Sequence, residues 1–215
     1  MSSAAKSLEF YLQECRTLFN DGKYARAIVA GSEGSQYFPE SAELIVLISE
    51  CYFLLNDSAK AKELIKQGFR RSPNHSGLGR RMLQMHAEEI IEKIRATDFE
   101  GALEITLVGC RLSAHVLELN LDPSDLYFAS RTTGFLYAQR AEIGSILGMS
   151  SADIFWNKRQ AITCYGESLR LAPCEKDIIN LYNCERKSYF DLITALGYSN
   201  EKEAIADLLP KVTQI

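Results

Sequence analysis

Five basic side chains fall within one short stretch of the sequence and could together bind an anion. They are Lys66, Arg70, Arg71, Arg80 and Arg81, and no acidic residue lies between them. In a chain with a formal net charge of −4, such a stretch could dock an acidic partner or a phosphate group. The alternative is a solvated helix end, where basic side chains complement the helix dipole. The sequence favours this alternative and leaves the five residues as a candidate anionic-partner patch.

The remaining polar residues show no arrangement that would carry catalysis or hold a metal. His86 and Glu89 lie one helical turn apart, but two ligands are too few for a zinc site. The six cysteines form no C-x-x-C pair, which favours reduced thiols. The chain also lacks a nucleophile elbow, a glycine-rich phosphate loop and a histidine-based triad spacing. We therefore expect a protein that is not an enzyme and that needs no metal or cofactor.

Composition places the chain among soluble globular proteins. Of its 215 residues, 47% are hydrophobic and 24% are charged, which gives no sign of disorder. The mild negative charge argues against an overall basic nucleic-acid binder. No window of about twenty apolar residues exists to span a membrane, and the first residues do not resemble a secretory signal. We expect a cytoplasmic protein that binds no nucleic acid and inserts into no membrane.

The elements that position these residues are helices. Apolar residues recur at helical spacing, and no strand-like alternation persists. Four of the five prolines fall where a helix should begin or end, because proline cannot continue a helix; these are Pro39, Pro73, Pro123 and Pro173. The sequence therefore predicts an all-α fold.

Two stretches of the chain repeat one another at an offset of 34 residues. Residues 22–28, followed by Pro39, match residues 56–62, followed by Pro73. A fixed period of this length indicates repeated helix–turn–helix units. The first unit is predicted to pair helices over 4–19 and 23–37, and the second pairs helices over 41–54 and 58–71. Ser41 and Ser58 are the predicted N-caps of the second pair.

The second of these units carries a resemblance to a known family. Its first helix has large, large, small and aromatic residues in the order Ile45, Ile48, Ser49 and Tyr52. In the first unit Tyr11, Cys15 and Leu18 serve similarly, but Glu14 stands where an apolar residue is usual. With this pattern the chain resembles the tetratricopeptide repeat family over residues 8–75, partly over 151–173, and only by analogy elsewhere.

The resemblance implies a right-handed α-solenoid of about ten helices in five helical hairpins, the later ones longer and irregular. We expect one repeat domain over 1–215. Its predicted hairpins are 8–41, 42–75, the irregular 76–122, a long hairpin over 123–173 and a capping hairpin over 174–215.

The first helix of each hairpin is expected to line a concave groove that binds a partner peptide or helix. In the family register the groove residues are Glu9, Leu12, Arg16, Phe19, Glu43, Val46, Glu50 and Phe53. The alternative is that the apolar members pack against the chain's own C-terminal helices. The family's clamp for acidic chaperone tails needs several basic and amide residues. Its slots here hold Leu12, Arg16 and Leu47, so cochaperone activity is not expected.

The leading functional prediction is a scaffold or adaptor that binds a protein segment in this groove. The first alternative is an assembly or export chaperone, which would shield an apolar client segment there. The second is a regulatory domain with a small-molecule site between the irregular helices. Phe155 and Trp156 follow a predicted loop and could contact a partner or a second copy of the chain. The sequence does not choose a partner, because repeat folds host many functions.

Overall fold

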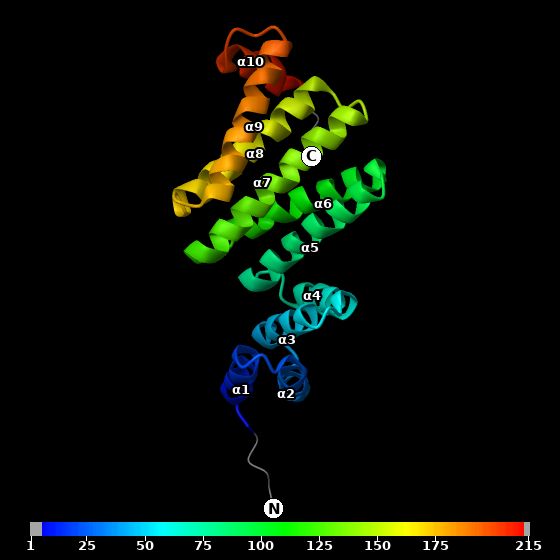
Figure 1. Ribbon diagram of the computed structural model, residues 1–215, viewed down its shortest axis with the longest axis vertical. Helices are drawn as coiled ribbons and strands as arrows, with labels where there is room; N and C mark the ends of the chain where they lie inside the picture. The colour runs from blue at the N-terminus through cyan, green and yellow to red at the C-terminus, as the bar shows by residue number, and fades with distance from the viewer. Residues whose placement is uncertain (1–5, 213–215) are drawn as a thin grey trace, which may run out of the picture. The chain divides into compact units, whose positions relative to one another are not determined.

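A computed structural model describes residues 6–212, which form ten α-helices and one 3₁₀ helix with no strand among them (Figure 1). In chain order the elements are α1 (Leu8–Asn20), α2 (Tyr24–Tyr37), α3 (Ala42–Leu54), α4 (Ser58–Arg71), α5 (Ser76–Arg95), α6 (Phe99–Glu118), α7 (Pro123–Ile146), α8 (Ser151–Leu171), α9 (Lys176–Ala195), α10 (Glu201–Leu208) and η1 (Leu209–Lys211). This confirms the predicted all-α fold. The helix start predicted at Ala4 and the hairpin end predicted at Ile215 lie outside the described residues.

The chain divides into two compact units, Met1–Met82 (unit 1) and Leu83–Ile215 (unit 2), with the boundary inside α5. In unit 1, α1 packs on α2, α2 on α3 and α3 on α4, and α1 also packs on α3. In unit 2 the long helices α7, α8 and α9 lie side by side in the same sequential manner (Figure 1). Packing between sequence neighbours is what the predicted solenoid requires.

One kind of turn closes all five hairpins. In each turn a single residue has a left-handed φ between 58° and 84°, and these residues are Gly22, Asn56, Thr97, Gly148 and Gly197. The residue that follows donates its N–H to the carbonyl five positions earlier, as Lys23 does to Leu18 over 2.8 Å and Asp57 to Tyr52 over 2.9 Å. This Schellman motif satisfies carbonyl groups that the helix end would otherwise leave without a donor.

A second kind of turn joins most successive hairpins. Phe38, Ser72 and Ala172 end their helices with φ near −130° and ψ of 63–69°, and each precedes a proline. The connection from α6 to α7 differs. There Pro123 is the first residue of α7, and the carboxylate of Asp122 caps that helix by accepting from the N–H of Asp125. Pro123 therefore starts a helix instead of separating two.

The predicted N-caps of the second hairpin have different outcomes. Ser41 caps α3 as expected, its hydroxyl accepting from the N–H of Leu44. The prediction for Ser58 is wrong, because Asp57 caps α4 and Ser58 is the first helical residue. The Asp57 carboxylate accepts from the N–H of Lys60 and also pairs with the Lys60 ammonium at 2.7 Å. A carboxylate that makes both contacts is a stronger cap than the adjacent hydroxyl.

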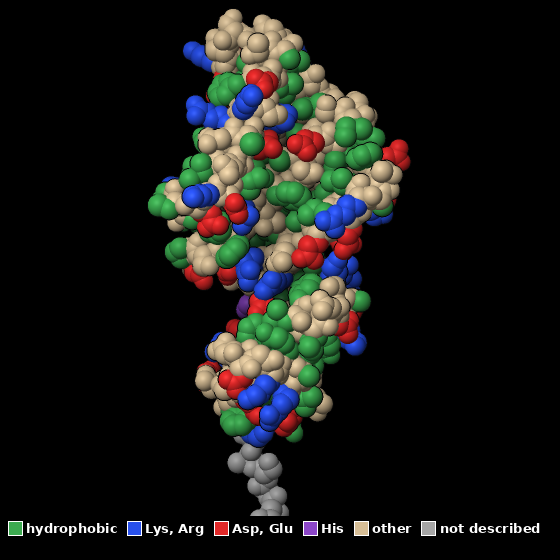
Figure 2. Space-filling model, viewed as in Figure 1, with side chains coloured by type: hydrophobic (Ala, Val, Ile, Leu, Met, Phe, Trp, Pro, Cys, Tyr) green, Lys and Arg blue, Asp and Glu red, His purple; other side chains and the backbone are tan. Residues whose placement is uncertain are grey.

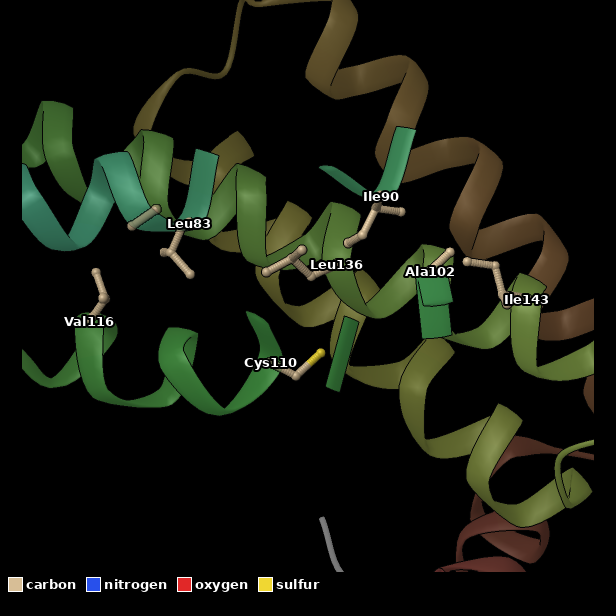
Figure 3. Packing of buried hydrophobic residues seen from close by; sticks show 8 residues of the cluster. Leu83, Ile90, Ala102, Cys110, Val116, Leu136 and Ile143 are labelled. Atoms are coloured by element: carbon tan, nitrogen blue, oxygen red, sulfur yellow. The ribbon is translucent and has the colours of Figure 1, made fainter. Parts of the chain in front are cut away.

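Each unit has its own buried apolar residues. A unit 2 cluster draws side chains from α5, α6 and α7, which converge in Figure 3; its buried members are Leu83, Ile90, Ala102, Cys110, Val116, Ala129, Leu136 and Ile143. Further along unit 2, Phe155 is fully buried and stacks on Tyr189 with ring centroids 5.2 Å apart. In the described part of the chain, no helix is both long and apolar enough to cross a bilayer.

Candidate functional site

The predicted groove residues lie on two helices of unit 1, α1 and α3, which pack against each other. Two apolar members serve the core of this unit. Leu12 is 6% exposed and belongs to a cluster with Tyr11, Cys15 and Leu44. Val46 is half-buried against a cluster that includes Leu78. Their burial is thus explained by residues of unit 1 itself.

The acidic members on α3 contact residues at the start of α5. Glu43 Oε1 lies 3.6 Å from His75 Nε2, just before α5 begins. A hydrogen bond from its own backbone N–H lowers the pKa of Glu43, and His75 acts in the same direction. Glu50 forms an ion pair with Arg81 in which both side chains are about four-fifths buried. The α3 part of the predicted groove is therefore tied to the start of α5.

The corresponding positions on α1 are open. Glu9 and Arg16 precede Glu43 and Glu50 by 34 residues, and both are exposed. Neither forms an ion pair with any residue between positions 6 and 212. They are seven positions apart, so they lie two turns apart on one face, about 10 Å along the helix. This face therefore presents one negative and one positive group at a fixed separation.

The two aromatic residues of the predicted groove are only partly exposed to a partner. Phe19 is half-buried and meets Tyr24 edge-on, with ring centroids 5.5 Å apart. Phe53, at the equivalent position on α3, is also half-buried. Each ring has an exposed part that a partner could cover.

A surface hollow of about 550 Å³ lies along α1, next to the predicted groove face. Glu9 is its one member from the predicted set; the others are Ser7, Phe10, Gln13, Glu14, Thr17 and Leu18. Phe10 is 44% exposed, and the Lys6 ammonium lies 4.7 Å from its ring centroid. The repeat pattern of the sequence does not predict this hollow. The sequence feature that indicates it is Phe10, an aromatic residue outside the helical spacing of Tyr11, Cys15 and Leu18.

Comparison with known proteins identifies the repeated unit of these helices. A family model described as "Tetratricopeptide repeat" matches residues 18–82. Residues 18–82 are tetratricopeptide repeats. The match covers most of the two units read from the 34-residue offset, and it confirms the predicted family. No curated protein matches the chain.

Solved structures show the same fold at low sequence identity. One is described as "MamA RS-1 ArsTM double mutant", with 14% identity, a TM-score of 0.53, and coverage of 95% of this chain and 100% of that one. Another is the pilF protein of Pseudomonas aeruginosa, with 16% identity, a TM-score of 0.50, and coverage of 91% and 78%. A tetratricopeptide repeat fold is a general protein-interaction module, and these matches establish the fold alone.

The basic patch predicted from sequence is not a set of five free cations. Arg81 pairs with Glu50 inside the repeats, and the Arg71 guanidinium donates to the carbonyl of Pro39 over 3.3 Å. Arg70 is exposed in the last turn of α4, where a positive charge complements the helix dipole. At least two members thus have structural partners, and anion binding by the patch stays a prediction. Elsewhere on the face in Figure 2, positive and negative side chains are intermixed.

The buried thiols within and beyond the repeats are poor nucleophiles. Burial raises the pKa of Cys15 and Cys51 to about 11 and that of Cys110 to about 12. These thiols are protonated at neutral pH, whereas the reactive form of cysteine is the thiolate. His86 Nδ1 lies 3.7 Å from Glu89 Oε2. The described residues hold no group of three or more side chains suited to a metal ion.

Proposed function

We propose that the tetratricopeptide repeats bind a segment of a partner protein along α1, and that the protein acts as a scaffold or adaptor. One observation carries the proposal. Glu9 and Arg16 are exposed and make no ion pair in the described chain, while Glu43 and Glu50, at the equivalent positions, are joined to His75 and Arg81. Along α3 the chain supplies partners for these carboxylates itself, and along α1 it leaves them to another molecule.

The chemistry of α1 restricts what the partner segment must carry. A basic group opposite Glu9 and an acidic group opposite Arg16 would match the two charges, at positions two turns apart if the segment is helical. An apolar side chain could enter the hollow beside Phe10. Exposed ion pairs contribute little affinity and mainly set orientation, so the apolar contact is expected to provide most of the binding energy.

Affinity capture with a charge-reversed variant tests this assignment. The full chain is used as bait in three forms: wild type, Glu9→Lys with Arg16→Glu, and a control with Arg26→Glu and Glu40→Lys. All three have the same net charge, and the control residues are exposed on other parts of unit 1. A partner held by wild type and control but lost by the first variant supports the site. Equal retention of the partner by all three forms would show that Glu9 and Arg16 do not bind it and would contradict the proposed site on α1.

The same experiment separates a scaffold from a chaperone. A scaffold should stay with its partner after the partner's assembly is complete, whereas a chaperone should hold the unassembled client and then release it. Capture at successive times after synthesis of the labelled partner distinguishes the two. Release on assembly would replace the scaffold function with the chaperone function.

A further inference from the structure

Unit 2 contains a second hollow, of about 770 Å³, far from α1 in the sequence. It is formed by α6, α7, α8 and the segment around η1. This volume lies within the range that small-molecule sites occupy. The hollow takes no part in the proposed function, which uses α1 alone.

The walls of this hollow are apolar and aromatic. Trp156, the only tryptophan in the sequence, and Tyr137 are half-buried on α8 and α7. Leu209, Pro210 and Val212 contribute aliphatic surface from the C-terminal segment, which packs on α8. Ligand sites typically combine such walls with a few polar groups that fix orientation.

The charge near the hollow is positive. Arg111 is the one charged residue among the described side chains that line it, and it is exposed. Arg140 lies close enough to lower the pKa values of both Cys110 and Tyr137, although burial dominates and raises each pKa to about 12. The Nε–H of Arg140 is buried and makes no hydrogen bond within residues 6–212. A ligand here would meet the Arg111 guanidinium and no carboxylate from the described lining, with the charge of Arg140 near Cys110 and Tyr137.

Binding, and not reaction, fits the polar groups present. Their raised pKa values keep the Cys110 thiol and the Tyr137 hydroxyl protonated at neutral pH, so neither supplies an anionic nucleophile. Both are neutral groups in an environment of low polarity, beside a cation at the rim. This arrangement matches a molecule with an apolar body and a single negative head.

We propose that the hollow of unit 2 binds a small amphipathic carboxylate, with the carboxylate at Arg111 and the apolar body against Trp156 and Tyr137. The ligand would also contact Leu209 and Pro210 of η1. A bound ligand would therefore contact η1, α6 and α7 together. This site is separate from the protein-binding face on α1, and its test does not depend on any partner.

The single tryptophan provides a direct readout. Decanoate is titrated into the full-length protein while Trp156 emission is followed under excitation selective for tryptophan. Decanol and decyltrimethylammonium have similar apolar chains but carry neutral and positive heads. The proposal predicts a saturable shift of emission with decanoate, a weaker effect with decanol and none with the cation. Equal responses to all three, or no response to decanoate, would overturn it.

Two variants locate the site. Arg111→Gln should weaken decanoate binding about tenfold, because hydrogen bonds between charged groups are the stronger ones, and should leave decanol binding unchanged. Arg26→Gln, an equally exposed arginine in unit 1, is the matched control and should bind as wild type. Ala114→Phe fills the hollow from an exposed lining position and should abolish both. Wild-type binding by Ala114→Phe, or equal loss in the two arginine variants, would contradict the assignment; circular dichroism checks that each variant is folded.

Discussion

The hairpins of unit 1 and those of unit 2 have the same types of turn and differ in the lengths of their helices. Helices α1 to α4 have 13 or 14 residues, whereas α6 to α9 have 20 to 24. The same left-handed turn nevertheless closes hairpins in both units, and the same proline turn follows α2, α4 and α8. The junctions, and not a fixed length, thus define this repeat.

Whole helical turns explain how the length changes without loss of register. α5 has seven residues more than α3 (20 against 13), which is two turns at 3.6 residues per turn. The capping residues Asp57 and Asp98 are accordingly 41 positions apart instead of 34. Two added whole turns return the side chains of α5 to their original face, so this helix can still pack through the same face.

Ionic groups distinguish the units in another way. In unit 1, Glu43 on α3 contacts His75 near the surface, whereas Glu50 pairs with Arg81 where both side chains are mostly buried. In unit 2, Lys158 on α8 is 8% exposed, and its ammonium donates to the Ser188 hydroxyl on α9 over 2.7 Å. Unit 1 thus pairs its mostly buried cation with a carboxylate, whereas unit 2 holds a buried cation against a hydroxyl group.

The largest difference in stability between variants of the two units is expected from aromatic residues. Phe155→Ala removes a fully buried ring that stacks on Tyr189, and should lower the free energy of unfolding by about 3–5 kcal/mol. Phe53→Ala in unit 1 removes a half-buried ring and should cost about 1 kcal/mol. Urea unfolding followed by circular dichroism measures both. Equal losses would show that Phe53 is as much a core residue as Phe155.

Two helical glycines should respond to alanine with opposite signs. At Gly68 in unit 1 a Cβ atom would lie 2.8 Å from Ile45 Cγ2, so Gly68→Ala should destabilise by about 1–2 kcal/mol despite a better helix propensity. At Gly166 in unit 2 the Cβ would meet Tyr182 at an ordinary 3.6 Å, so Gly166→Ala should stabilise by up to about 1 kcal/mol. Thermal melting of each variant against wild type checks this. A gain at Gly68 would mean that the short helices are packed more loosely than their contacts indicate.

Within unit 1, the paired and unpaired acidic residues should separate stability from binding. Glu50→Gln removes the charge that pairs with Arg81 in a mostly buried position and should lower the free energy of unfolding by about 1 kcal/mol. Glu9→Gln should change it by less than about 0.5 kcal/mol, because exposed residues outside such contacts have small effects. Melting temperatures measured side by side provide the test. A matching loss at Glu9 would reveal a structural partner and weaken its role in binding.

The smallest expected effect is the pH-dependent stability from the capping residues Asp57 and Asp98. It should be similar in both units. Hydrogen bonds from Lys60 and Lys93 hold the pKa values of Asp57 and Asp98 below the usual aspartate value. A lowered carboxyl pKa stabilises the folded state above the unfolded pKa of about 4, and this contribution is lost as pH falls through the folded pKa. Asp57→Asn and Asp98→Asn keep a capping oxygen but do not titrate. Their melting temperatures should fall slightly below wild type at pH 7 and converge with it in acid; a gap that persists in acid would point to another cause.

Much of the fold could be predicted from sequence because its signals are local. Gly22 and Asn56 at the turns, and Pro39 and Pro73 after the hairpins, mark the ends of helices through the conformations of their own backbones. The cap at Ser58 was mispredicted because two adjacent residues could both cap a helix, and only the structure shows that the Asp57 carboxylate is also held by Lys60.

The site was less predictable because it depends on contacts between hairpins. The contacts of Glu43 with His75 and of Glu50 with Arg81 span 31 or 32 positions, and helical spacing does not show which side chains meet across that distance. Leu12 has the spacing of a groove residue, yet it packs into the core beside Leu44. The hollow around Trp156 depends on where the segment around η1 lies, which no repeat pattern specifies.

The open charges of α1 are the centre of this account, and one binding measurement tests them most directly. Once a partner segment has been captured, its dissociation constant is measured by calorimetry for wild type, for Glu9→Lys with Arg16→Glu, and for the control Arg26→Glu with Glu40→Lys. The account predicts at least about tenfold weaker binding for the first pair alone, because both charges then oppose the partner. Affinity unchanged in the first pair, or weakened equally in both, would contradict it.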